Sequence, residues 1–217
     1  MQLVLASNNR KKLAELQALL APSGVALVTQ QQLGISEADE PHHTFIENAL
    51  VKARHAARLC GGPAIADDSG LCVASLGGAP GVASAHYADV ILGAGERGVQ
   101  RGVQREVQRA VQDAANNALL VERLKGAADR RAHFICTLVA LRTADDPEPL
   151  VAVGRWQGEI LDSPSGEGGF GYDSLMFIPA LGCTVAQLSP EAKNTQSHRA
   201  LAASQMLALL REVWRLG

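Results

Sequence analysis

Apolar positions follow two patterns along this chain of 217 residues. Compact apolar runs predict strands over residues 3–6, 25–29, 64–67, 71–76, 133–142, 150–156, 159–161 and 173–178. Apolar residues three or four positions apart predict helices near residues 10–20, 44–59, 114–124 and 197–216. This alternation favours an α/β fold, in which the short connections near 144–149 and 162–169 make some neighbouring strands antiparallel.

Capping and turn residues separate these elements. Ser7-Asn8-Asn9 is a helix start, Thr44 and Glu47 form a capping-box pattern, and Gly61 is expected to end the helix that follows. Polar or glycine-rich stretches predict loops over 33–43, 164–171 and 189–197. Asp67-Asp68-Ser69-Gly70 is interpreted as a turn between two strands.

A short repeat occupies residues 93–113, where Val-Gln-Arg recurs every four residues from Val99 to Arg109. On a helix, that period gives valine and arginine stripes that drift slowly around the axis. The repeat is too short for a solenoid. We expect a surface helical extension that serves as a solvated spacer, with a dimer contact or an acidic partner site as the alternatives.

Composition excludes several classes of protein. Apolar residues make up 47% of the chain and the net charge is −2, which argues against disorder and against a general nucleic-acid binder or acidic-membrane binder. No apolar run approaches membrane-spanning length, and residues 1–6 lack the features of a signal peptide. Four cysteines without a C-x-x-C pair indicate a reducing compartment, so a cytoplasmic location is expected.

Adjacent carboxylates mark the first candidate site. Asp67 and Asp68 follow an apolar segment, and two neighbouring negative charges repel each other unless a cation or a proton offsets them. Mg²⁺ with substrate phosphates meets that need, because this ion takes one or two carboxylates and completes its shell with water and phosphate. One of Glu37, Asp39 and Glu40 is a candidate second ligand. A plain polar turn is the competing interpretation.

Basic residues at two helix starts suggest an anion site. Lys11 and Lys12 lie in the first turn after Ser7-Asn8-Asn9, and Arg199 follows the cap Ser197, although a helix N-terminus is itself partially positive. A bound phosphate would remove this conflict, whereas solvated first turns are the alternative.

The segment 165–173 places Phe170 between glycines, which suits stacking on a base or, alternatively, a loop whose ring enters the core.

In this order, six segments resemble the inosine/xanthosine triphosphate pyrophosphatase family over nearly the whole chain, apart from about residues 91–118. They are Leu5–Asn9 with Lys12 and Glu15, Thr44–Ala49 with Lys52-Ala53, Ala66–Leu71, Gly77–Val82, Gly168–Asp173 and Ser197–Ala200. The resemblance implies one domain over residues 1–217, an α/β fold of two lobes around a long twisted mixed β-sheet flanked by helices, with the active cleft between the lobes. It further implies hydrolysis of the purine nucleoside triphosphates ITP, dITP and XTP to the monophosphate and pyrophosphate, Mg²⁺ dependence and a homodimer.

The resemblance also implies roles for single residues. Asp68 matches the proton acceptor and a metal ligand, and Glu40 falls near the second acidic metal residue. The residues implied to bind the triphosphate and its surroundings are Ser7, Asn8, Asn9, Arg10, Lys11, Lys12, Lys52 and Ser69. Those implied to line the base pocket are Phe170, Gly171, Tyr172, Asp173, Lys193, His198 and Arg199. Donors such as Arg199 would select hypoxanthine and xanthine through O6, an acceptor where adenine has an amino donor.

Two positions depart from the family pattern: His86 replaces an arginine and Ser174 replaces a proline. Neither change removes a catalytic group, although His86 would alter phosphate contacts or dimer packing. Two other functions stay open. A related pyrophosphatase of the Maf type would act on standard or methylated nucleotides, and a non-catalytic binding protein would work through the arginine stripe at 97–109.

Overall fold

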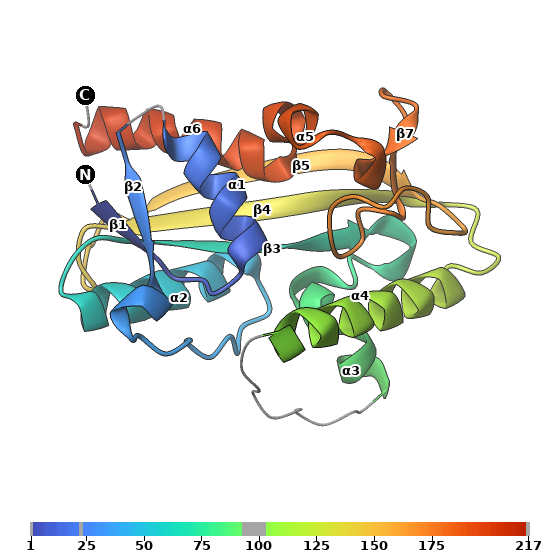
Figure 1. Cartoon of the computed structure of the whole chain (residues 1–217), viewed down its shortest axis with the longest axis horizontal. Coiled ribbons are helices and arrows are strands. Elements are labelled where there is room, and N and C mark those ends of the chain that lie inside the picture. Colours follow the sequence, from blue (N-terminus) through green and yellow to red (C-terminus); the bar gives the residue numbers. More distant parts are fainter. Residues whose placement is uncertain (1, 22–23, 93–102, 216–217) are drawn as a thin grey trace. The chain divides into compact units, whose positions relative to one another are not determined.

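The computed structural model describes residues 2–21, 24–92 and 103–215 (Figure 1). Its strands are β1 (Gln2–Leu5), β2 (Ala26–Thr29), β3 (Ala64–Val73), β4 (Arg131–Leu141), β5 (Leu150–Ile160), β6 (Met176–Ile178) and β7 (Cys183–Thr184). Its helices are α1 (Arg10–Leu20), α2 (Phe45–Cys60), α3 (Tyr87–Leu92), α4 (Val103–Arg123), α5 (Pro190–Gln196) and α6 (His198–Val213). Short 3₁₀ turns are η2 (Gln30–Leu33), η3 (Ala74–Leu76), η4 (Gly81–His86) and η5 (Val185–Gln187). None of the described helices is long and apolar enough to cross a membrane.

The described strands form one mixed sheet of seven strands in the order β2-β1-β3-β4-β5-β6-β7. β1 pairs in parallel with β2 and with β3, whereas β6 is antiparallel to both β5 and β7. The predicted α/β fold with a mixed sheet is therefore confirmed.

The chain divides into two compact units. The first contains residues 1–69, 135–156 and 194–217, and the second contains residues 70–134 and 157–193. β3, β4 and β5 each contribute residues to both units, so the units are not consecutive stretches of chain.

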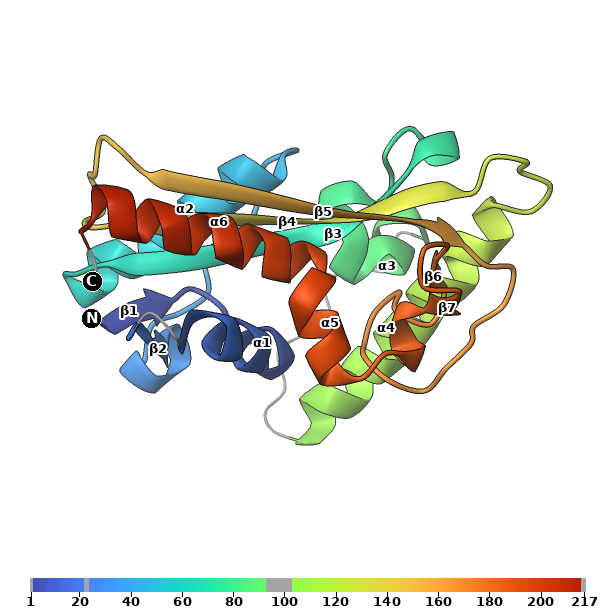
Figure 2. The same cartoon turned by 90° about the horizontal axis from the view of Figure 1, so that it is seen from above.

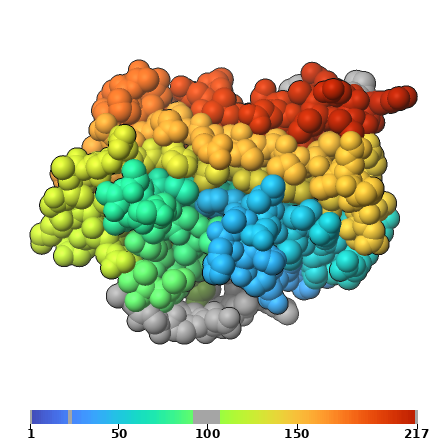
Figure 3. Space-filling view, turned by 180° about the vertical axis from the view of Figure 1, so that it is seen from behind, coloured from blue at the N-terminus to red at the C-terminus, as the bar shows by residue number. Residues whose placement is uncertain are grey.

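Strand alternation builds two apolar cores in the first unit. Leu3, Leu5 and Ile65 pack with α1 and α6 on one face of the sheet. Their sequence neighbours, among them Val4 and Ala64, pack with the alanines of α2 on the other face. Figure 2 shows α1 and α6 on one side of these strands and α2 on the other, and Figure 3 shows α2, in blue, at the molecular surface. Successive side chains of a strand point to opposite faces, so β1, β3, β4 and β5 each contribute to both cores.

Local signals fixed the helix starts correctly. Asn9 caps α1 by accepting bonds from the amides of Lys11 and Lys12, and Thr44 caps α2 by accepting from the Glu47 amide. The predicted helix end is also confirmed, since Gly61 adopts the left-handed conformation there.

Three predicted boundaries are wrong. Asp67–Gly70 is not a turn, because β3 runs through it without interruption. β5 is likewise one strand where two were predicted, at 150–156 and 159–161. The loop predicted over 189–197 contains α5, which begins with a proline at its first position, where no helical amide bond is lost, and Ser189 accepts from the Ala192 amide.

The predicted helix over the repeat lies partly outside the described residues, because residues 93–102 are not among them. α4 begins at Val103 and continues through the predicted helix 114–124 to Arg123. The side chains of Val107 and Val111 are exposed. The role of the repeat as a surface extension stays a prediction.

Gly154 of β5 lies against the first turn of α6. A Cβ here would overlap the carbonyl oxygen of His198 and lie 2.6 Å from the amide nitrogen of Ala202. We expect Gly154→Ala to lower the free energy of unfolding in urea by about 1–3 kcal/mol, the usual cost of overpacking. The matched control is Gly62→Ala, whose new Cβ would meet no atom within 4 Å. An equal loss in both variants would contradict the close approach as the cause.

Candidate active site

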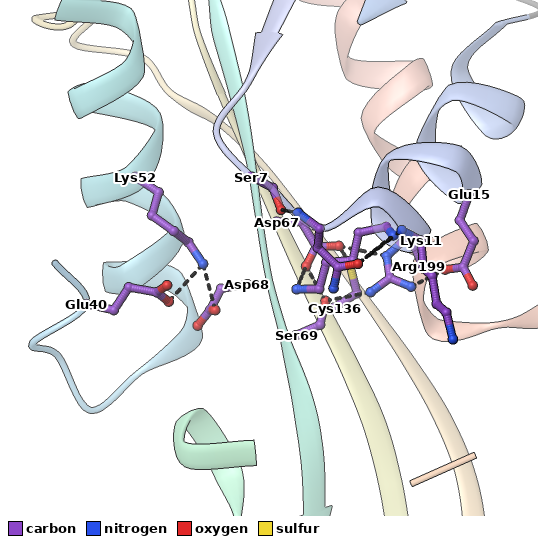
Figure 4. Close-up of polar contacts among 12 residues, drawn as sticks. Ser7, Lys11, Glu15, Glu40, Lys52, Asp67, Asp68, Ser69, Cys136 and Arg199 are labelled. Atoms are coloured by element: carbon purple, nitrogen blue, oxygen red, sulfur yellow. Dashed lines mark hydrogen bonds and ion pairs between the residues drawn. The ribbon is translucent and has the colours of Figure 1, made fainter. Parts of the chain in front are cut away.

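The two adjacent aspartates project from opposite faces of β3. Asp67 continues the face of Ile65, toward α1 and α6, and Asp68 continues the face of Ala66, toward α2 (Figure 4). The predicted repulsion within the pair is therefore relieved by strand geometry, since the period of two separates the carboxylates and gives each its own cation. Both cations belong to the protein: Lys12 for Asp67 and Lys52 for Asp68.

Asp67 is the centre of a buried network on the α1 and α6 face. Its Oδ1 accepts from Lys12 Nζ at 2.6 Å and from Ser69 Oγ at 2.5 Å, and its Oδ2 accepts from Arg199 Nε at 2.7 Å. Arg199 also donates to Glu15 of α1. The Asp67 side chain is fully buried and that of Arg199 is 1% exposed. This network joins the first two turns of α1 to β3 and to the start of α6.

The charges of this network are fixed. Burial alone would raise the pKa of Asp67, but Arg199 and Lys12 hold it well below its usual range, so Asp67 stays ionised. Burial opposes the charge of Arg199 too, yet Asp67 and Glu15 raise its pKa. The thiol of Cys136, which donates to Asp67 Oδ2 at 3.4 Å, has its pKa raised by burial and by that carboxylate. Asp67 therefore acts here as a structural anion.

On the α2 face, Lys52 gathers two carboxylates. Its Nζ donates to Asp68 Oδ1 at 2.9 Å and to Glu40 Oε2 at 2.8 Å. Burial raises the pKa of Asp68 to about 6, although Lys52 counteracts this shift. Burial also lowers the pKa of Lys52, but its two acidic partners outweigh that effect and raise it. Asp68 is thus an acid whose two protonation states lie close in free energy near neutral pH.

Two carboxylates, Asp68 and Glu40, meet at Lys52, and carboxylate oxygens are ligands that Mg²⁺ takes in proteins. In the described residues no group of three or more His, Cys, Asp or Glu side chains is placed to hold a metal. Mg²⁺ usually takes only one or two carboxylates and keeps waters and phosphates as its other ligands. The buried Oδ2 of Asp68 has no hydrogen-bond partner in the described structure, so one ligand oxygen is left over.

At the start of α1, the predicted phosphate-binding segment has acceptors and donors in place. Ser7 Oγ accepts from the Asn9 amide at 3.2 Å, and Asn9 Oδ1 accepts from Lys11 and Lys12. Within the described chain, buried Oδ1 of Asn8 and buried Nδ2 of Asn9 lack hydrogen-bond partners. Lys12 pairs with Asp67 within the protein, and the binding of a phosphate by Lys12 stays a prediction. Arg10 and Lys11 are exposed there.

In the second unit, the predicted base loop is held in one shape. Asp173 Oδ2 accepts from the Phe170 amide at 3.0 Å and from Lys193 Nζ at 2.8 Å. Lys193 Nζ also lies 4.6 Å from the centre of the Phe170 ring, a cation–π distance. Tyr172 is buried, its hydroxyl donates to the carbonyl of Ser84 at 2.9 Å, and burial raises its pKa.

The structure thus brings the predicted residues into three groups. Phosphate-segment residues lie at the start of α1, Asp68, Lys52 and Glu40 meet beside α2, and Phe170 to Asp173 meet Lys193 in the second unit. His198 and Arg199 are buried in the first unit, where Arg199 binds Asp67, Glu15 and Ser69. Their part in a base pocket stays a prediction.

Sequence reasoning missed the partners that hold these groups. Asp67 was seen only as half of a repelling pair, and Glu15 only as part of a motif. The sequence did hold a signal for Asp67. If the strand continues through Asp67, this residue lies two positions after Ile65 and therefore on the same face, toward α1 and α6.

The fold and the site define an α/β protein in which strand β3 of a mixed sheet carries one ionised, buried acid and, next to it, a second acid whose pKa is raised to about 6. Residues 3–209 match the profile of the Ham1 family, and the chain belongs to this family. It is 68% identical over 214 residues to a dITP/XTP pyrophosphatase of Methylibium petroleiphilum, covering 99% of both chains. It is 65% identical to a dITP/XTP pyrophosphatase of Leptothrix cholodnii, covering both completely. A solved HAM1 protein from Coxiella burnetii is 39% identical, with a TM-score of 0.83 over 98% of this chain and 100% of that one.

Proposed function

We propose that this protein is a nucleoside-triphosphate pyrophosphatase that hydrolyses dITP, XTP and ITP to the monophosphate and pyrophosphate. The observation that carries the proposal is Asp68, a buried carboxyl with a pKa of about 6 beside Lys52 and Glu40. The dITP/XTP pyrophosphatases with which the chain shares up to 68% of its residues supply the substrate class. Removal of such nucleotides from the pool would be its cellular task.

In this reaction Asp68 accepts a proton from the water that attacks the α-phosphorus. In the protein without metal the pKa of Asp68 is about 6, so the carboxyl is mostly ionised at neutral pH, as a proton acceptor must be. The start of α1, with Ser7, Asn8 and Asn9, binds the phosphates through amides and side-chain donors. Lys52 keeps Asp68 oriented and offsets its charge. Little covalent chemistry is asked of the protein, so positioning supplies most of the rate enhancement.

We propose Mg²⁺ as the cofactor, held by Asp68 and Glu40. Bound there, the ion would offset the negative charge that develops on the phosphates. Two observations support this assignment: the buried Oδ2 of Asp68 has no hydrogen-bond partner in the described structure, and the carboxylate of Glu40 is exposed.

Magnesium binding should be visible in the titration of Asp68. In the protein without added metal, the Asp68 carboxyl is expected to titrate near pH 6, and Mg²⁺ should lower that pKa because a nearby cation favours the ionised form. Carboxyl ¹³C NMR of aspartate-labelled protein measures both. Asp129, whose pKa a hydrogen bond from Arg131 lowers to about 2, is the internal control and should not respond. An Asp68 signal that Mg²⁺ leaves in place would refute the metal assignment.

Pyrophosphate release tests the proposed activity directly. ITP, XTP, dITP, GTP and ATP are compared with Mg²⁺ and with EDTA. Fast metal-dependent release from ITP, XTP and dITP but not from ATP is the expected result. Equal rates for all five would keep the chemistry and discard base selection, as for a Maf-type enzyme. Nucleotide binding without any release would favour a binding protein.

We further propose that the protein acts as a homodimer in the cytoplasm, with a purine nucleoside triphosphate as its ligand and without nucleic acid. Exposed apolar side chains on α3 and α4, such as Val90 at 62% and Val107 at 60%, are compatible with a second copy as partner. None of the four cysteines, all of which lie within the described residues, forms a disulfide, and this is compatible with a reducing compartment. Sedimentation measures the mass in solution, and a monomer at all concentrations would contradict the dimer.

A further inference from the structure

Two side chains of α4 hold Gly171 from both sides. The Gly171 amide donates to Asp113 Oδ2 at 2.9 Å, and Asn117 Nδ2 donates to the Gly171 carbonyl at 3.1 Å. Asp113 and Asn117 are four residues apart, so they lie next to each other on one face of the helix. The two hydrogen bonds therefore fix the peptide planes that precede and follow Gly171.

This contact matters because Gly171 can adopt many backbone conformations and directly follows Phe170, so its conformation affects the direction of the Phe170 ring. Its φ is +61°, a conformation that glycine adopts at little cost. It directly follows Phe170, whose own amide is held by Asp173 and whose ring lies over Lys193. The Phe170 carbonyl also accepts from the Asp173 amide at 3.2 Å. The contacts from α4 therefore add a second hold on the peptide between Phe170 and Gly171, and they also hold the peptide that follows.

α4 itself is anchored to the same unit. Asn116 accepts from the Ala88 amide at 2.9 Å and donates to the carbonyls of Ser84 and Ala85. The Ser84 carbonyl also accepts from the hydroxyl of Tyr172. The helix and the loop therefore share one attachment point, so the direction of α4 sets the place where Asp113 and Asn117 meet Gly171.

We infer that Asp113 and Asn117 are positioning residues for the base loop, which set the orientation of Phe170 through Gly171. The inference rests on the proposed function and on the expectation from the sequence that Phe170 stacks on the base of the nucleotide. Neither residue need touch the substrate. Both lie in the region, about residues 91–118, that the family motifs leave out. Through them, α4 would influence the affinity for the nucleotide.

Steady-state kinetics with ITP provides the first test, using Asp113→Ala, Asp113→Asn and the control Glu122→Ala. Glu122 is exposed on the same helix. Asp113→Ala should raise KM about tenfold with kcat nearly unchanged, because a misplaced stacking ring weakens ground state and transition state alike. Asp113→Asn keeps an oxygen that can accept from Gly171 and should restore KM to within about twofold of the unmodified protein. A wild-type KM in Asp113→Ala, or an equal rise in Glu122→Ala, would overturn the inference.

Amide hydrogen exchange of Gly171, followed by NMR, gives a readout that needs no catalysis. Asp113→Ala should speed this exchange at least several-fold, and Glu122→Ala should not. Unchanged exchange in Asp113→Ala would overturn the inference whatever the kinetics show. The two failures are separable: an unmodified protein that releases no pyrophosphate refutes the proposed function, while the exchange experiment still decides whether α4 holds the loop.

Discussion

Asp68→Asn is expected to lower kcat for pyrophosphate release from ITP by about 10²–10⁴-fold, the usual contribution of a general base. Asparagine has nearly the same shape but cannot take a proton at neutral pH. Nucleotide affinity should fall far less, because the start of α1 and the loop at Phe170 are untouched. Stopped-flow or coupled assays give kcat, and calorimetry gives the affinity.

Asp39→Asn is the matched control for this substitution. Asp39 is an exposed carboxylate next to Glu40, in the loop that was expected to supply the second acidic ligand. Its replacement should leave kcat within about twofold, as for ordinary surface changes. Retained turnover in Asp68→Asn would remove Asp68 from the role of proton acceptor, and an equal loss in both variants would point to a general effect of negative charge.

Arg199→Met is expected to have the largest effect on stability. It leaves the carboxylates of Asp67 and Glu15 without their shared cation, and Asp67 is fully buried. Breaking a buried pair from one side costs about 3–5 kcal/mol in the free energy of unfolding. Urea unfolding at pH 7 measures the loss.

The pH dependence of that loss identifies its cause. In the unmodified protein the pKa of Asp67 is lowered, so this group stabilises the fold above about pH 3.9 and the stabilisation is lost as the pH falls below that value. In Arg199→Met the buried Asp67 binds a proton more readily, so the difference between the two proteins should shrink in acid. Arg131→Met, which breaks the exposed pair with Asp129, should change the urea midpoint far less at every pH, because exposed ion pairs contribute little to stability. A pH-independent deficit in Arg199→Met would indicate lost packing and not lost pairing.

The parts of the fold that sequence predicted best depend on neighbours in the chain. The caps Asn9, Thr44 and Ser197 act within three residues of themselves, and the structure confirms all three. The family motifs supplied the candidate site residues, and their roles stay predictions. Ser189-Pro190 was also a local signal for α5, but the polar composition around it outweighed that signal in the interpretation.

The parts that sequence missed depend on partners far away. Polar residues and a glycine interrupt an apolar run at Asp67–Gly70, and such an interruption usually indicates a turn. Here it is strand, because Lys12, Lys52 and Arg199 supply buried counter-charges from three different helices. The bond from Arg199 to Asp67 spans 132 positions, and nothing near either residue announces it. The same holds for Asp113, which meets Gly171 across 58 positions.

Because the two aspartates lie on opposite faces of β3, one of them can stabilise the fold while the other is kept for the proposed reaction. Asp67 keeps its charge and favours the folded state, whereas the raised pKa of Asp68 destabilises the folded state progressively above about pH 3.9 and fully above about pH 6. The proposed base at residue 68 thus lowers the stability of the folded state, whereas Asp67, one residue earlier, raises it. Substitutions at residue 68 should therefore raise the free energy of unfolding and abolish turnover, while substitutions at residue 67 should lower the free energy of unfolding. Selection for activity would act on the first position and selection for stability on the second.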